Sequence, residues 1–420
     1  MLSSRWCAPA IVALAIALAS AAVSGRAQDG WHGVLDEHPS ILYATRPTTD
    51  PVARLSRALR DGGKPLAHDA RTGYLLPLLH ALDIAPESQI LVFSKTGVQR
   101  EYTGPQNPRA LYFNESVIVG YVPGAPVIEI ASHDPQQGIV FYVLDQSAST
   151  AVMSRRTTCL SCHVSATTLN VPGVIARSNM VDEDGNLLPH ADTHDVNHST
   201  THPDRWGGWY VTSEGAPAPY SQRGHGGNIT FTAQGNTSNQ VFVEWMHGAP
   251  EQRPYPLASS DTVSLLTFDH QSRAINLMTR LNWEARIAGA SPLASSDVRE
   301  LVNELAEYLL FTNEAPLPVP LSPIPAFAEH LRARTPKDSR GRSFAQLELV
   351  NRLLRYPCSF MVYSEAFDGL PGDVRQAVYR RMREVLAGEG VPASYARVSA
   401  DDRRAIEEIL LDTKPDFSAQ

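Results

Sequence analysis

The fold class of this 420-residue chain follows from two neighbouring segments, Val127-Ile-Glu-Ile130 and Gly138-Ile-Val-Phe-Tyr-Val-Leu144. Both segments are rich in β-branched and aromatic residues and are set off by proline and glycine, a composition typical of strands joined by turns. The same composition recurs at residues 89–94 and 110–122, and short helical patterns occupy residues 51–59 and 74–82. We therefore expect a sheet-containing mixed α/β module over residues 28–150.

The pattern becomes helical from Asp261 onward. One face of a long predicted helix carries Val263, Leu266, His270, Leu277 and Leu281. Asp297 and Glu300 form a predicted capping box at the start of a second helix. Three more helices are predicted, over residues 344–356, over residues 373–387 with Gly388 as C-cap, and over residues 399–413 with a capping box of Ser399 and Asp402. The C-terminal part, residues 236–420, is therefore expected to be mainly helical.

Residues 151–235, between these two parts, are poor in regular patterns and rich in Gly, Pro, Asn and Thr. Only two short strands are predicted there, over residues 209–212 and 228–232. Binding groups often lie on such loops, held by a regular scaffold. The predicted fold class is α+β, with a sheet-containing N-terminal part, a loop-rich centre and a mainly helical C-terminal part.

The first 27 residues have the features of an export signal. Arg5 precedes an apolar run over residues 11–23, and Gly25-Arg26-Ala27 offers a small-x-small cleavage site. The run is shorter than the roughly 20 residues that cross a bilayer, and no later segment approaches a membrane span in length and apolarity. We expect a periplasmic or secreted mature chain without a membrane span. Loss of Arg5 and Arg26 takes its formal charge from −8 to −10, which argues against a nucleic-acid binder with a basic face.

One short motif carries specific chemistry: Cys159-Leu160-Ser161-Cys162-His163. Each thiol can add to one vinyl group of a porphyrin, and the next residue is then placed as the proximal iron ligand, so this spacing is the attachment signal of haem c. With 4 cysteines and 14 histidines in the chain, chance would produce about 0.001 copies of the motif. We therefore predict one covalent haem c, attached through Cys159 and Cys162 and ligated by His163.

Two other interpretations use the same cysteines. A thioredoxin-like redox pair would open a helix after a strand, but Arg155-Arg156-Thr157-Thr158 precedes the motif. A zinc site would need a second pair of Cys or His ligands, which the histidines between Pro189 and Pro203 could supply. Cys7 lies in the predicted leader, so Cys358 has no partner and is predicted to be a buried free thiol.

The motif resembles that of c-type cytochromes, and this resemblance covers only its five residues. Over a longer part, the chain resembles a group of large exported bacterial proteins with a single Cys-x-x-Cys-His, known only as uncharacterised cytochrome-like proteins. The similarity lies in residues 89–95, 107–114, 205–212 and 355–360. The resemblance implies haem binding and electron transfer and supplies no substrate.

The sixth iron ligand is expected to decide the function, because a filled position favours electron transfer and an open one favours small-molecule chemistry. The candidates, in this order, are His225 between glycines that admit a flat ligand, His270 on the apolar helix face, and Met180. Met246 also lies at a suitable distance from the motif. Histidines recur every four residues between Pro189 and Pro203, at His190, His194, His198 and His202. The flanking prolines indicate a polar loop rather than a helical metal site, although one of these histidines could still reach the iron.

Two functional classes follow. The first is an exported monohaem cytochrome that transfers single electrons to or from a redox partner protein, for which the acidic charge favours a basic partner. The second is a haem c-dependent oxidoreductase, peroxidase-like or acting on a small molecule, with an open or labile sixth position; the size of the chain favours it. A second haem motif, expected for the dihaem peroxidases, is absent from the sequence. In either class, Arg155 and Arg156 are candidate partners of the haem propionates.

Overall fold

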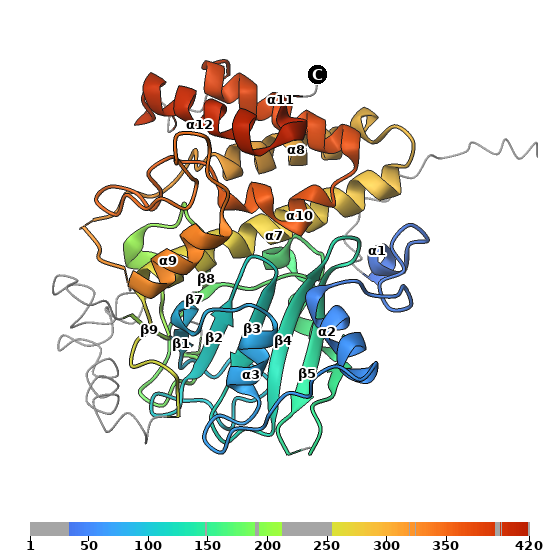
Figure 1. Ribbon diagram of the computed structural model, residues 1–420, viewed down its shortest axis with the longest axis vertical. Helices are drawn as coiled ribbons and strands as arrows, with labels where there is room; N and C mark the ends of the chain where they lie inside the picture. Colours follow the sequence, from blue (N-terminus) through green and yellow to red (C-terminus); the bar gives the residue numbers. More distant parts are fainter. Residues whose placement is uncertain are drawn as a thin grey trace, which may run out of the picture. The chain divides into compact units, whose positions relative to one another are not determined.

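The predicted hairpin is part of an antiparallel sheet (Figure 1), in which β4 (Val127–Asp134) pairs with β5 (Gly138–Asp145) along their whole length. The computed structural model describes residues 33–147, 149–189, 193–211, 254–318, 320–323, 325–390, 395 and 397–418. Within these residues the sheet has seven strands in the order β6-β5-β4-β3-β2-β1-β9. The other strands are β1 (Ile90–Val92), β2 (Arg109–Phe113), β3 (Val117–Tyr121), β6 (Met153–Arg155) and β9 (Trp209–Tyr210). The strands predicted within the described residues are confirmed, with residues 110–122 divided into two.

Both faces of the sheet are packed. On one face, Ile128 and Ile130 are buried in an apolar cluster with α2 (Pro51–Arg60) and α3 (Leu75–Ala81), which cover the sheet in Figure 1. The other face contributes Phe113, Ile118 and Phe141 to a larger cluster shared with the C-terminal helices. The predicted helices over residues 51–59 and 74–82 are confirmed. The side chains on the two faces of the sheet therefore belong to two separate apolar clusters.

The long helix α7 (Thr262–Ala288) runs between this sheet and the C-terminal helices α8 (Ser296–Leu309), α11 (Gly372–Ala387) and α12 (Ala400–Thr413) (Figure 1). It begins after the N-cap Asp261, whose carboxylate accepts the N–H of Ser264. Most of the helix is buried, apart from a half-buried stripe in its second half that includes Arg273, Arg280 and Glu284.

The other helices are α1 (Gly33–Glu37), α4 (Leu160–His163), α9 (Pro325–Arg334) and α10 (Glu365–Asp368). The predicted C-cap Gly388 is confirmed, with φ 93°. Ser399 caps α12 by accepting the N–H of Asp402, but the Asp402 carboxylate accepts from Arg352 and Arg355, so only the serine half of the predicted capping box is confirmed.

Two predictions for the helical part are wrong. Residues 344–356 are not a helix, because the Glu348 carboxylate accepts the backbone N–H groups of Val350, Asn351 and Arg352 and turns the chain back. The N-cap of α8 is Ser295, whose hydroxyl accepts the N–H of Val298, rather than the pair of Asp297 and Glu300. The sequence pattern also missed α9. At residues 348–352 and at the start of α8, a side-chain oxygen close in sequence thus accepts the backbone N–H groups and determines the local structure.

The loop-rich centre supplies two strands to the sheet edges, β6 and β9, so residues beyond 150 belong to the same sheet as the N-terminal part. A separate two-stranded ladder joins β7 (Arg177–Asn179) and β8 (Thr193–Asp195). The predicted strand over residues 228–232 lies outside the described residues, as do residues 1–27. No described helix has the length and apolarity to cross a membrane. The architecture is α+β, as predicted.

Candidate functional site

The Cys-x-x-Cys-His motif forms a tight helical turn. A 3₁₀ turn over Thr157–Cys159 leads directly into α4, and Cys159 itself has helical dihedral angles of −63° and −25°. Residues three apart on such a turn lie on the same side, so Cys159 and Cys162 present their thiols to the same region. Cys162 is exposed, Cys159 is half-buried, and neither is in a disulfide. Burial, with the nearby Glu129 carboxylate, raises the pKa of the Cys159 thiol.

The His163 ring is held in one orientation by a backbone carbonyl. Its Nδ1 lies 2.9 Å from the oxygen of Gly173, and because a carbonyl only accepts, Nδ1 carries the proton. The ring also packs against Phe141 of β5, with centroids 4.7 Å apart. Burial lowers the pKa of His163, which favours the neutral ring. This tautomer leaves the Nε2 lone pair for a metal, the state that a haem iron requires.

The turn lies against the sheet face that α2 and α3 do not cover. Cys159 and Leu160 pack on the same apolar cluster as Leu111 of β2 and Ala131 of β4. Along the first part of β4, Val127, Glu129 and Ala131 on this face are only half-buried, whereas Ile128 and Ile130 on the opposite face are buried. A partly uncovered apolar surface therefore lies beside the two thiols. Such a surface suits a flat apolar ligand.

A cation without a full set of acceptors lies on this face. The Arg109 side chain is 16% exposed, and its Nε is 3.6 Å from Glu129 Oε2. Its Nε and Nη2 are buried, and no described residue accepts a hydrogen bond from either. Arg109 and Arg177 both lie close enough to His163 to lower the pKa of its ring, after the larger effect of burial. Arg109 is thus a better candidate for a carboxylate of a bound group than the exposed Arg156.

The sequence did not single out Arg109. Arg109 directly precedes the predicted strand segment over residues 110–122, and a charged side chain at the start of an apolar and aromatic strand is the signal that could have identified it. Arg155, which the sequence did single out, donates instead to the carbonyl of Tyr43 and to Gln137 Oε1. The Arg155 guanidinium also lies 4.8 Å from the centroid of the Tyr43 ring. Arg155 is thus held by partners within the protein through its Nη2, while its Nε is buried without an acceptor among the described residues.

The residues predicted as distal iron ligands differ in whether the structure describes them and in whether their side chains are free to bind a metal. His225 and Met246 lie outside the described residues. Met180 directly follows β7 and is half-buried, and its carbonyl accepts the N–H of Leu188. His270 is fully buried, and both of its ring nitrogens are engaged, by His198 Nδ1 at 2.8 Å and by Ser359 Oγ at 2.6 Å. This arrangement leaves no ring nitrogen of His270 for an iron, so we do not retain it as a distal ligand.

His198 and His270 instead form a buried pair. Tyr308 stacks on both rings, with centroids 4.1 Å from His198 and 5.1 Å from His270. Next to the pair, Arg205 donates to the carbonyl of His198 and forms an ion pair with Asp269. Burial lowers the pKa of His198 and lowers that of His270 to about 3. Both rings are buried and are therefore neutral at physiological pH.

This pair is expected to make the fold acid-sensitive. In the unfolded chain, histidines become protonated below their ordinary pKa of 6.5. In the folded chain, His198 and His270 become protonated only below their lowered pKa values, which for His270 is about 3. Stability is thus present above pH 6.5 and is lost as pH falls below it, by about 1.4 kcal/mol per pH unit for each histidine. Asp269 and Glu314 act in the opposite sense, because burial raises their pKa to about 6 and about 7.

Urea unfolding between pH 4 and pH 7 isolates this contribution when the chain is compared with its His198→Phe variant, which retains an aromatic ring beside Tyr308 and Phe311. Below pH 6.5, the free energy of unfolding should fall with decreasing pH less steeply in the variant, by about 1.4 kcal/mol per pH unit. Identical slopes in the two proteins would show that His198 titrates normally in the folded chain.

The remaining histidines of the four-residue series do not gather into one site. His194 is exposed on β8, whereas His198 and His202 are buried. His190 lies outside the described residues. In the part of the chain that the structure describes, no group of three His, Cys, Asp or Glu side chains is placed to hold a metal ion. The described residues therefore offer no second ligand pair to complete a zinc site with the two cysteines.

Comparisons with known proteins do not identify a relative of this chain. No family model matches the chain, and neither the curated proteins nor the solved structures include a significant match. What the chain presents is a helical turn with two thiols and an oriented imidazole, beside a half-covered apolar sheet face and a partly unsatisfied guanidinium.

Proposed function

We propose that this chain is an exported monohaem c-type cytochrome that transfers single electrons through a haem c attached to Cys159 and Cys162. The observation that carries the proposal is the His163 ring, whose Nδ1–H is bound by Gly173 and whose Nε2 is left for an iron, directly after two thiols on one helical turn. A bound haem c supplies reversible one-electron exchange at its iron.

The residues around the motif fit such a group. Two thioethers from Cys159 and Cys162 would fix the porphyrin edge, and His163 would supply the proximal nitrogen. Leu111 and Ala131 would exclude water from one side, because they belong to the apolar cluster on which the turn packs. The buried nitrogens of Arg109 would balance a propionate. In this proposal the export signal stays assigned to residues 1–27, and the acidic charge favours a basic redox partner.

A second candidate is a haem c-dependent oxidoreductase with an open sixth position. The observation that favours it is the engagement of both nitrogens of His270, which removes one of the predicted distal ligands. An iron without a sixth protein ligand would be accessible to peroxide, oxygen or another small molecule.

Optical spectra of the purified holoprotein distinguish the two candidates. We expect a low-spin ferrous spectrum that carbon monoxide leaves unchanged, because a filled sixth position resists exchange. The measurement is repeated on the ferric protein with cyanide and with hydrogen peroxide. A high-spin ferric spectrum that responds to either reagent would overturn the electron-transfer proposal and favour the oxidoreductase.

A further inference from the structure

A buried asparagine of α7 holds the peptide unit that orients His163. Asn276 is 2% exposed, its Oδ1 accepts the N–H of Val174 at 2.8 Å, and its Nδ2 donates to the carbonyl of Val174 at 2.8 Å. The two bonds fasten a loop residue to a helix that begins almost a hundred residues later in the sequence. No feature of the local sequence around the motif requires this contact.

The contact reaches His163 through a single peptide group. The N–H of Val174 and the carbonyl of Gly173 belong to the same planar unit. Asn276 Oδ1 accepts from one end of this unit, and His163 Nδ1 donates to the other end at 2.9 Å. Hydrogen bonds in such a chain polarise one another, so the bond from Asn276 makes the Gly173 oxygen a stronger acceptor.

The loop is built to allow this approach. A Cβ at Gly173 would overlap Asn276 Oδ1 and would lie 2.8 Å from the Cβ of Thr168, so the position requires glycine. The N–H of Gly173 also donates to the carbonyl of His163 at 3.1 Å, and the carbonyl of Pro172 accepts the N–H of Ile139 from β5. The sheet and α7 thus fix the loop from two directions.

We infer that Asn276 is a positioning residue that tunes the iron-ligating strength of His163, an inference that rests on the proposed haem function. A strong acceptor at Nδ1–H raises the basicity of the ligating nitrogen and favours the ferric iron. Removing the Asn276 amide weakens that acceptor and frees the ring to rotate. The bound haem then becomes easier to reduce.

The test compares Asn276→Ala with Asn282→Ala in the haem-loaded protein. Asn282 is a matched control, because it is also buried on α7 and also donates to backbone carbonyls, those of Pro135 and Gly369, away from the His163 loop. We expect Asn276→Ala to shift the ratio of reduced to oxidised haem at a fixed potential by roughly tenfold, which is 59 mV for a one-electron couple. Its electron paramagnetic resonance g-values should also change, since they report the axial ring. Asn282→Ala should change neither.

The outcomes separate this inference from the proposed function. Absence of covalent haem from the unmodified chain would refute the function itself. Equal potentials and g-values for Asn276→Ala and Asn282→Ala, with haem attached, would overturn the role of Asn276 alone. If Asn276→Ala does not accumulate as holoprotein, Asn276→Leu takes its place, because its side chain has a similar shape but lacks the amide oxygen that accepts the N–H of Val174. An unchanged potential and unchanged g-values in that variant would overturn the inference equally.

Discussion

The double variant Cys159→Ala, Cys162→Ala is expected to lose its covalent haem completely. Each thiol supplies one of the two bonds that hold the porphyrin after the protein is denatured, and no other described cysteine lies at the motif. The measurement is haem staining of the denatured chain after electrophoresis, together with the mass of the purified protein. Retention of stain or of the haem mass in the double variant would refute the assignment of the attachment site.

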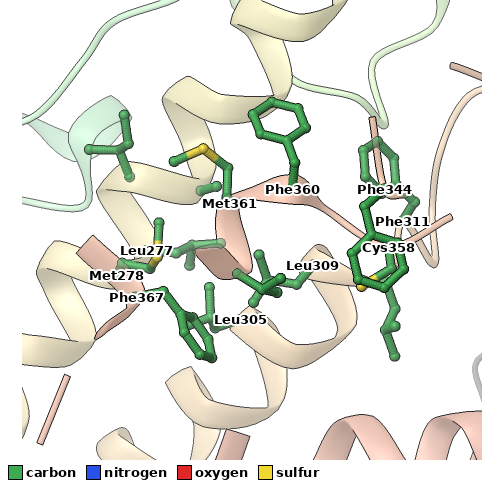
Figure 2. Close-up of a cluster of buried hydrophobic side chains, with 14 of the residues drawn as sticks. Leu277, Met278, Leu305, Leu309, Phe311, Phe344, Cys358, Phe360, Met361 and Phe367 are labelled. Atoms are coloured by element: carbon green, nitrogen blue, oxygen red, sulfur yellow. The ribbon is translucent and has the colours of Figure 1, made fainter. Parts of the chain in front are cut away.

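Cys358→Ala is the control for this experiment. Cys358 is fully buried, and Figure 2 shows it near Phe311 and Phe344, among apolar side chains of the helical half. Burial raises the pKa of this thiol well above its ordinary value, so it stays protonated and unreactive. The buried free thiol predicted from the sequence is confirmed. The control variant should keep its full haem content, and a loss there would indicate that any cysteine change disrupts haem attachment.

Arg205→Ala is expected to lower the free energy of unfolding by about 3–5 kcal/mol, because it leaves one member of a buried ion pair behind. The Arg205 side chain is 1% exposed, and that of its partner Asp269 is 4% exposed. The same guanidinium also donates to the carbonyls of Thr200 and His198, which fixes the loop beside the histidine pair. Trp206 Nε1 still donates to Asp269 after the change, at 3.0 Å, and only partly compensates.

The matched control is Arg54→Ala, at an ion pair with Glu365 in which both side chains are 48% exposed. Exposed pairs contribute at most about 1 kcal/mol, so this variant should unfold at nearly the same urea concentration as the unmodified chain. Both are measured at pH 8, above the pKa of about 6 to which burial raises Asp269, so that its carboxyl stays charged. If the two variants lose similar stability, the buried pair contributes no more than a surface pair does.

The parts of the fold that the sequence predicted are those where neighbouring residues decide the structure. The β-branched and aromatic strands β4 and β5, the capping serine Ser399 and the C-cap Gly388 each depend on residues within a few positions, and each is confirmed. The helix predicted over residues 344–356 is wrong for a related reason, since Glu348 offers the backbone an alternative acceptor that periodicity does not register.

In the candidate site, too, the residues close together in sequence were predicted and the distant ones were not. The two thiols and His163 were predicted because their chemistry depends on spacing along the chain. Arg109 and Asn276 were not, because they reach the motif from a distant strand and a distant helix. His270 was predicted as a ligand from its position on an apolar helix face, but its partner His198 is 72 positions away in the sequence. Only the folded chain brings such pairs together.

The positions of β6 and β9 at opposite edges of the sheet have a consequence for folding. The strands from β1 to β6 pair with neighbours close in sequence, whereas the pairing of Leu91 with Tyr210 joins residues 119 positions apart. Closing a loop of that length costs about 4 kcal/mol of chain entropy, so this pairing has a high contact order and forms slowly. We expect six strands to assemble first and β9 to dock last. The motif lies in the loop that this last step closes, so attachment of a group to its thiols can precede completion of the sheet.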